Sequence, residues 1–199
     1  MQNLDDLQKV LIIGSGPTEI GHETELDSAT VQIITGFKKH GVRTLVIDNN
    51  PFSVALEEIQ PTNMYVQAVT TANVRHIIER DQPDAILPTL GGLLGIRIAQ
   101  ELVENGDIGR FGVTILGMPA ATLRQINNPA ALNDTLKEIH EPVIEAQVVS
   151  TEDEALGLVE SIGFPLIVKP VAPRLDTNRT ICENVDDMLD ALNQGFAQS

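Results

Sequence analysis

The sequence has little cysteine, few aromatic residues and no long apolar run. Its single cysteine, Cys182, excludes an internal disulfide and a cysteine-based zinc site. Tryptophan is absent and aromatic residues make up 3% of the chain, so a core must consist mainly of Ile, Leu, Val and Ala. No apolar run approaches the ~20 residues that a membrane helix needs. Residues 1–8 are polar and acidic, unlike a signal peptide, which favours a cytoplasmic protein without membrane association.

Basic charge is scarce as well. The 199 residues include 13 Lys and Arg against 28 Asp and Glu, a formal net charge of −15. No basic block is available to neutralise a phosphate backbone, so nucleic-acid binding is not expected. An anionic membrane surface would repel the chain. Apolar residues make up 42% of the sequence, which is enough for a folded core at this length.

Residues 1–118 alternate between short apolar strands and amphipathic helices. The expected strands are 9–13, 44–47, 64–66, 84–87 and 113–116, and the expected helices are 27–40, 71–81 and 93–105. Asp27 or Ser28 is expected to cap the first helix, and Gly41 to end it. Strands that are apolar throughout are typical of a parallel sheet covered on both faces. The predicted fold class is therefore α/β, with an open parallel sheet.

The pattern changes after residue 118, and we predict two domains, 1–118 and 119–199. The second contains expected helices at 119–126, 129–139, 151–161 and 185–196, strands at 143–149 and 164–168, and an irregular stretch up to Asn184. Thr151 and Glu154 have the spacing of a capping box. Two strands make a marginal sheet on their own. This small domain therefore either packs against the first domain or belongs to a larger assembly or chain, and a protein partner or self-association is expected.

Glycine-rich turns follow two of the expected strands. The first, Gly14-Ser15-Gly16-Pro17-Thr18-Glu19-Ile20-Gly21, lies where a dinucleotide-binding turn would, and Asp48 ends the next strand like a ribose-binding acid. Glu19 occupies the place of the third small residue, so a sharp structural turn competes with nicotinamide binding. The second turn, Gly91-Gly92, is expected at the same edge. The candidate binding residues of these strand-end loops are Gly14, Gly16, Gly21, Glu25, Asn50, Gly91 and Gly92.

The other residues that could bind a metal or a phosphate, or act in catalysis, give less specific evidence for a site. The acidic residues Glu19, Glu23, Glu25 and Asp27, with His22 among them, form either a metal site or a solvated loop, and we assign no metal ligand. Lys169 closes an apolar strand, which suggests that it is partly buried or directed at a phosphate or at a carboxylate such as Asp176. Neither Cys182 nor any histidine has a partner residue that indicates nucleophilic catalysis, and no catalytic residue is assigned.

Several segments, taken in order along the chain, resemble the start of the carbamoyl-phosphate synthetase large subunit. They are Ile13-Gly14-Ser15-Gly16-Pro17, Ile20-Gly21, Glu25-Leu26-Asp27, Asn50-Pro51, Arg80 to Thr89, Gly91-Gly92, Phe111 to Gly117, Glu154-Ala155-Leu156 and Gly163 to Pro170. The resemblance implies a Rossmann-like pre-ATP-grasp domain over about 1–118. It implies linker helices and a partial ATP-grasp α+β subdomain over 119–199.

The departures from that family pattern concern the ATP site. The family has an arginine in the helix that here begins Asn128-Pro129-Ala130, and a glycine-rich loop where this chain has Val171 to Thr180 without glycine. The resemblance puts the magnesium-binding carboxylates beyond residue 199 and leaves Lys169 as the candidate contact to ATP phosphate. We therefore expect a binding or regulatory module that does not catalyse alone. The alternatives are a fragment or separate chain of the ligase, and a nicotinamide-dependent oxidoreductase.

Overall fold

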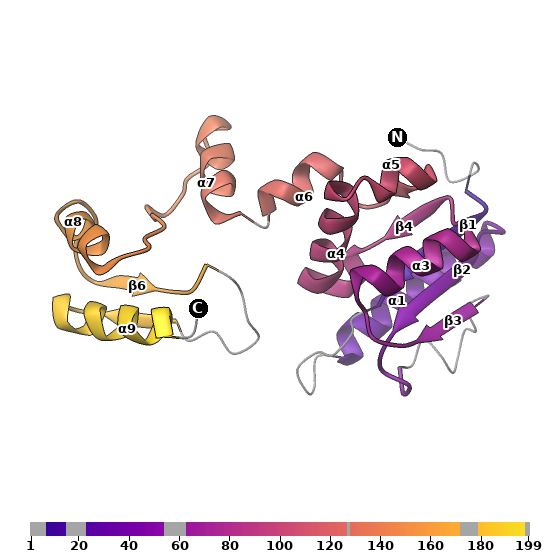
Figure 1. Ribbon diagram of the computed structural model, residues 1–199, viewed down its shortest axis with the longest axis horizontal. Coiled ribbons are helices and arrows are strands. Elements are labelled where there is room, and N and C mark those ends of the chain that lie inside the picture. Colours follow the sequence, from indigo (N-terminus) through magenta and orange to yellow (C-terminus); the bar gives the residue numbers. More distant parts are fainter. Residues whose placement is uncertain (1–6, 15–22, 54–62, 127, 172–178, 198–199) are drawn as a thin grey trace. The chain divides into compact units, whose positions relative to one another are not determined.

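The chain is divided into two compact units, residues 1–127 and residues 128–199. The computed structural model describes residues 7–14, 23–53, 63–126, 128–171 and 179–197. Each unit has its own hydrophobic core, so the two are described separately. Figure 1 shows both units, with the elements labelled where there is room.

The first unit is an α/β fold built on a five-stranded sheet in the order β3-β2-β1-β4-β5, in which all neighbouring strands are parallel. Its elements are β1 (Lys9–Ile13), α1 (Glu23–Lys39), β2 (Arg43–Asp48), β3 (Asn63–Val66), α3 (Thr71–Asp81), β4 (Ala85–Leu87), the 3-10 turn η2 (Thr89–Gly91), α4 (Gly92–Glu104), α5 (Asp107–Phe111), β5 (Thr114–Ile115) and α6 (Ala120–Ile126). The ranges of β1 and α3 coincide with the predicted ones. The predicted parallel α/β class is confirmed.

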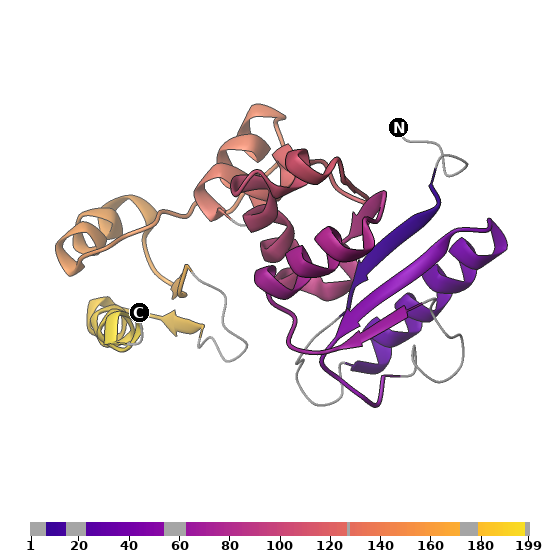
Figure 2. The ribbon, with the colours of Figure 1, turned by 45° about the vertical axis from the view of Figure 1, so that its right-hand side comes forward.

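Helices cover both faces of this sheet, as the apolar strands predict. On one face, Leu11 and Ile13 of β1 pack with buried residues of α3 and α4. On the other face, Val10 and Ile12 pack with Ile34 and Phe37 of α1. Figure 2 shows α1 and the α3–α4 pair on opposite sides of the strands. Because neighbouring strands are parallel, their carboxyl ends lie at one edge of the sheet, and Gly14 and Gly91 follow strands that end there.

Helix α1 begins earlier than predicted, and α5 was not predicted. Since α1 starts at Glu23, Asp27 and Ser28 lie inside the helix and the prediction that one of them caps it is wrong. Asp27 is 6% exposed, so its side chain is used for packing and hydrogen bonding within the unit. The predicted end is confirmed: α1 stops at Lys39, and Gly41 follows with φ of +74°.

The predicted boundary after residue 118 is placed too early. Helix α6 packs against α4, and its Leu123 is fully buried in the core of the first unit. The first unit therefore extends to residue 127. The sequence pattern suggested otherwise because Pro119 marks a new helix, but a helix start does not show which core the helix joins.

The second unit is an α+β arrangement around a two-stranded antiparallel sheet. Its elements are α7 (Pro129–Glu138), α8 (Glu152–Ile162), β6 (Leu166–Val168), β7 (Thr180–Cys182) and α9 (Val185–Ala197). Cys182, Met188, Ala191 and Leu192 form its buried centre together with Ala155 of α8. Figure 1 shows β6 running beside α9, in agreement with the contacts between them.

Two predictions for this unit are corrected and one is confirmed. Residues 143–149 form no strand, although their apolar residues suggested one, and Ile144 is 91% exposed. Strand β7 lies in the stretch predicted to be irregular. The predicted Thr151 cap of α8 is present: its hydroxyl accepts a hydrogen bond from the Glu154 amide at 3.2 Å, and the Glu154 carboxylate accepts one at 2.7 Å from the amide of Ser150, the residue before the cap. Among the described helices, none has the length and apolar character to cross a membrane.

Candidate functional site

Gly14 lies at the carboxyl edge of the sheet in a place that admits no side chain. Its amide donates a hydrogen bond to the Ile47 carbonyl at 2.8 Å. A Cβ atom at Gly14 would lie 2.3 Å from Asp48 Oδ2 and 2.9 Å from the Ile47 carbonyl oxygen. Glycine is therefore required here by the close approach of β1 to the end of β2.

Asp48 is held inside the edge and does not project from it. The residue is 3% exposed, and its Oδ1 accepts a hydrogen bond from the Asn50 amide at 2.9 Å. The Asn50 side chain in turn accepts one from the Phe52 amide at 3.0 Å. The Asp48 carboxylate thus orders the turn after β2. A carboxylate fixed against Gly14 also makes this part of the edge unfavourable for a phosphate group.

A second buried carboxylate joins α1 to the same turn. Asp27 Oδ1 accepts a hydrogen bond from the Ser53 hydroxyl at 2.9 Å, and the two residues are 6% and 2% exposed. Ser53 was not predicted as a site residue, because it lies 26 positions after Asp27 and so large a separation gives no spacing signal. This bond fixes the first half of α1 to the end of β2.

The glycines after β4 close the other half of the edge. A Cβ at Gly91 would lie 2.8 Å from the Gly14 carbonyl oxygen, and one at Gly95 would lie 2.1 Å from the Pro88 carbonyl oxygen. Gly92 starts α4 with φ of +54°, a conformation that favours glycine. The structure therefore brings Gly14 and Gly91 into contact at one edge, and the glycines there serve close backbone packing.

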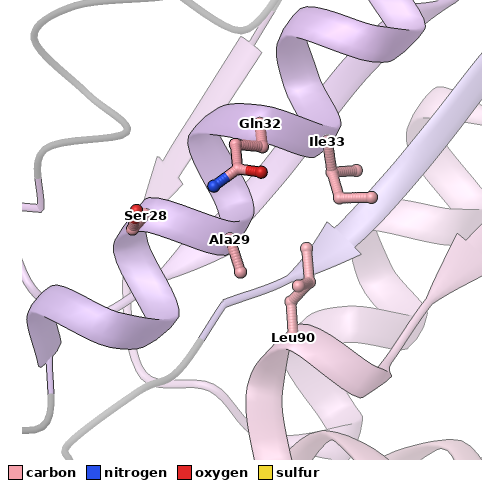
Figure 3. A pocket seen from close by; sticks show the side chains of 5 residues that line it. All are labelled: Ser28, Ala29, Gln32, Ile33 and Leu90. Carbon is pink, nitrogen blue, oxygen red and sulfur yellow. The ribbon is translucent and has the colours of Figure 1, made fainter.

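A shallow open depression lies beside this edge, between α1 and η2. Its lining residues are Ser28, Ala29, Gln32, Ile33 and Leu90. Figure 3 shows the Leu90 side chain from η2 facing Ala29 and Ile33 of α1. The lining is mostly apolar and carries no charged side chain. The depression is thus suited to an apolar contact and offers no group for acid–base chemistry.

The second unit presents a different kind of surface at β6 and β7. Ile167 and Ile181 are directly opposite each other in the register and are 60% and 64% exposed, while Leu166, Val168 and Cys182 face the core. Lys169 follows β6 immediately and is exposed. Of the two alternatives for Lys169, partial burial is excluded, because β6 ends at Val168 and Lys169 is exposed, whereas a contact to a phosphate or a carboxylate stays a prediction. Asp176, its suggested partner, lies outside the described residues.

The remaining predicted site residues are placed as follows. Gly16, Gly21, Glu19 and His22 lie outside the described residues, and Glu25 is described only as part of the α1 backbone. Within the described part of the chain, no group of three or more His, Cys, Asp or Glu side chains is arranged to hold a metal ion. Cys182 is fully buried, and burial together with the nearby Asp187 charge raises the pKa of its thiol. A thiol in this environment is a poor nucleophile.

These features define an α/β protein with a glycine-lined sheet edge, followed by a small α+β unit with an exposed apolar strand pair. The family description "Carbamoyl phosphate synthase preATP-grasp domain" matches residues 6–125, and "Carbamoyl-phosphate synthase L chain, ATP binding domain" matches residues 130–199. The chain belongs to the carbamoyl phosphate synthase large-chain family.

One relative supports this assignment, and two solved structures share the fold. The chain is 33% identical over its whole length to the carbamoyl phosphate synthase arginine-specific large chain of Halalkalibacterium halodurans, and it spans 19% of that relative's length. The biotin carboxylase domain of Hydrogenobacter thermophilus 2-oxoglutarate carboxylase, in complex with MgADP, ADP and bicarbonate, matches with a TM-score of 0.71 at 17% identity, over 96% of this chain and 41% of the other.

The second solved structure is the N5-carboxyaminoimidazole synthetase of Staphylococcus aureus complexed with ADP. It matches with a TM-score of 0.62 at 17% identity, over 96% of this chain and 44% of the other. At these identities the solved structures establish the fold alone.

Proposed function

We propose that residues 1–199 act as a binding module of the carbamoyl phosphate synthase large-chain type and do not form carbamoyl phosphate by themselves. The observation that carries the proposal is the exposed Ile167–Ile181 pair with Lys169 beside it, since an apolar strand pair open to solvent is a surface for binding. Phosphoryl transfer works mainly by positioning and charge neutralisation. A single exposed lysine at the end of β6 offers little of either.

A nucleotide is the first ligand to test at this surface. Residues 130–199 match a family described as an ATP binding domain, and both solved structures named above hold ADP. The first unit is a weaker candidate, because the negative charge of the Asp48 carboxylate, which lies against Gly14, would repel a phosphate there. The nicotinamide alternative is also less favoured, because the Asp48 carboxylate is 3% exposed and already accepts a hydrogen bond from the Asn50 amide.

The test is calorimetric titration of the 199-residue chain with MgATP and with ADP, together with a phosphate-release assay. We expect binding without turnover, weakened in Lys169→Ala. Lys137→Ala is the matched control, because Lys137 is an exposed lysine of the same unit at the end of α7. Sustained ATP hydrolysis by the purified chain would contradict the proposal.

A second candidate is that the chain is part of an ATP-dependent ligase whose remainder comes from a longer product or from a separate chain. The observation that favours it is the same apolar strand pair, which a further part of the ligase would cover. Mass measurement of the native gene product tests the first version. Phosphate release that appears only after a candidate partner chain is added would support the second.

A further inference from the structure

The outward face of helix α1 combines uncharged residues with positive charge at one end. Residues three or four positions apart share one side of a helix. The exposed residues of one such row are Ser28, Gln32, Gly36 and Lys39. A Cβ at Gly36 would meet nothing beyond its own helix within 4 Å, so the middle of the row has room for an approaching side chain. Lys39 follows Lys38 in the last turn and ends the row with positive charge.

The shallow depression described above widens this face beside the first half of α1. Ala29 and Ile33, which lie next to the row, face Leu90 of η2 across the depression (Figure 3). Ile33 is 36% exposed, and none of the lining side chains is charged. Exposed apolar groups of this kind favour contact with another chain.

Helix α8 of the second unit presents an exposed face of complementary pattern. Asp153, Leu156 and Glu160 are three and four positions apart, so they share one side of the helix, and all three are exposed. Leu156 is 40% exposed, whereas the other side of α8 packs Ala155 into the core of its unit. The first turn of α8 holds three acidic residues. This face therefore begins with negative charge, and an apolar side chain follows one turn later.

The two faces match when the helices are laid antiparallel. In this arrangement Asp153 can lie opposite Lys39 and form an ion pair with it. Both rows then continue to a residue three positions away. Leu156 therefore lies opposite Gly36, where α1 has room for its side chain.

The remaining part of the arrangement brings no like charges together. Glu160 lies four positions after Leu156, and Gln32 lies four positions before Gly36, so these residues are opposite as well. The Gln32 amide group can donate a hydrogen bond to the Glu160 carboxylate. Antiparallel helices also bring the positive end of one helix dipole beside the negative end of the other. Charge, shape and direction therefore agree in one arrangement.

We propose that the outward face of α1 binds helix α8 of a second copy of this chain as an antiparallel helix pair, so that copies associate head to tail. The interface is heterologous, because two different surfaces meet. A second copy supplies an acidic helix that fits the charge and the spacing of α1. Elsewhere the formal net charge of −15 makes two copies repel, which favours this contact over others. The inference does not depend on nucleotide binding by either unit.

The association is expected to be weak. An 11-residue helix is ~16 Å long, so its contact with α1 is smaller than the ~1,200 Å² that stable interfaces bury. We expect half-association at about 0.1–1 mM. Sedimentation velocity of the 199-residue chain between ~10 µM and ~1 mM at low salt measures the association. Added salt should reduce it, because the contact between Lys39 and Asp153 is exposed.

Charge reversal tests the pair directly. Lys39→Glu and Asp153→Lys each set like charges opposite each other and should weaken the association at least ~5-fold, the value of an exposed charge contact. The matched controls are Lys137→Glu and Asp134→Lys. They make the same changes of charge at exposed positions of α7 and should leave the association unchanged.

A mixture of the two charge-reversed variants separates contact between copies from contact within one chain. Each variant keeps unchanged the helix that is altered in the other, and the two altered helices again carry opposite charges. The mixture of Lys39→Glu and Asp153→Lys should therefore associate about as strongly as the wild type, although neither variant does so alone. A contact within one chain would not be restored by mixing.

Gly36→Gln tests the shape of the face without a change of charge. Its side chain would occupy the space opposite Leu156 and should weaken the association, while the urea midpoint should not fall, because a Cβ at Gly36 meets nothing within 4 Å. The proposal is overturned if the wild type stays monomeric at ~1 mM or if the mixture associates no more than its components. It is also overturned if the α7 controls lose as much as the α1 and α8 variants.

Discussion

Replacement of Gly14 by alanine tests whether the sheet edge is fixed by backbone packing. The added Cβ would lie 2.3 Å from Asp48 Oδ2 and 2.9 Å from the Ile47 carbonyl oxygen. To reach ordinary contact distance, the Asp48 carboxylate would have to move by about 1 Å. That movement strains its 2.9 Å hydrogen bond from the Asn50 amide. The Ile47 carbonyl oxygen cannot move away easily, because it accepts a hydrogen bond from the Gly14 amide at 2.8 Å.

The expected loss of stability follows from these two contacts. Overpacking of a tight interior site costs ~1–3 kcal/mol. Loss of a hydrogen bond to a charged group costs ~1.5 kcal/mol or more. We therefore expect Gly14→Ala to lower the free energy of unfolding of the first unit by about 3 kcal/mol, which corresponds to about 10 °C in Tm for a unit of this size.

The assay can follow the first unit selectively. The chain has no tryptophan and one tyrosine, Tyr65, which lies in β3, so tyrosine fluorescence during urea unfolding reports on the unit that contains Gly14. Gly36→Ala is the matched control: Gly36 lies inside α1, and a Cβ there would meet nothing within 4 Å. Since alanine is the better helix former, this control should gain ~0.5–1 kcal/mol. A loss below about 1 kcal/mol for Gly14→Ala would refute the packing argument.

Three more outcomes follow from the described contacts. Ser53→Ala should lower stability by ~1–2 kcal/mol in urea unfolding, because it removes the hydrogen bond to buried Asp27; an unchanged midpoint would contradict this. Gly95→Ala should be more damaging than Gly36→Ala in the same assay, since its Cβ would lie 2.1 Å from the Pro88 carbonyl oxygen. Cys182 should resist thiol reagents until the second unit unfolds. Burial raises the pKa of the Cys182 thiol, so the stability that the protonated thiol contributes is present below the ordinary thiol pKa of ~8.5 and is lost as the pH rises through the raised pKa. The urea midpoint of the second unit should therefore fall over that pH range. A urea midpoint that does not change with pH, or rapid labelling of the native protein, would contradict a buried thiol.

The sequence was sufficient for the parallel sheet but not for the ends of its elements. Periodicity located β1 and α3 at their observed bounds because those patterns are local. The start of α1 was misplaced, since Asp27 has the chemistry of a cap but is used for a hydrogen bond to Ser53. Strand β7 was not predicted from the sequence, because its three residues give too short a pattern and the strand forms by pairing with β6.

The candidate site was predictable only in part, for a similar reason. That Gly14 and Gly91 share an edge follows from parallel strands, which all end on one side. That the space beside these two glycines is occupied could not be predicted from the sequence, because the atoms concerned are the Asp48 carboxylate and the Ile47 carbonyl beside Gly14, and the Gly14 carbonyl beside Gly91.

The burial of Leu123 determines where the first unit can be separated from the rest of the protein. A chain cut after residue 118 would lose α6 and leave the surface of α4 that Leu123 covers open to water. Such a fragment should aggregate, whereas one that continues through Ile126 keeps its core closed. For gene fusions or exchanges between relatives, the junction that preserves both units therefore falls after α6, ahead of the Asn128 that caps α7.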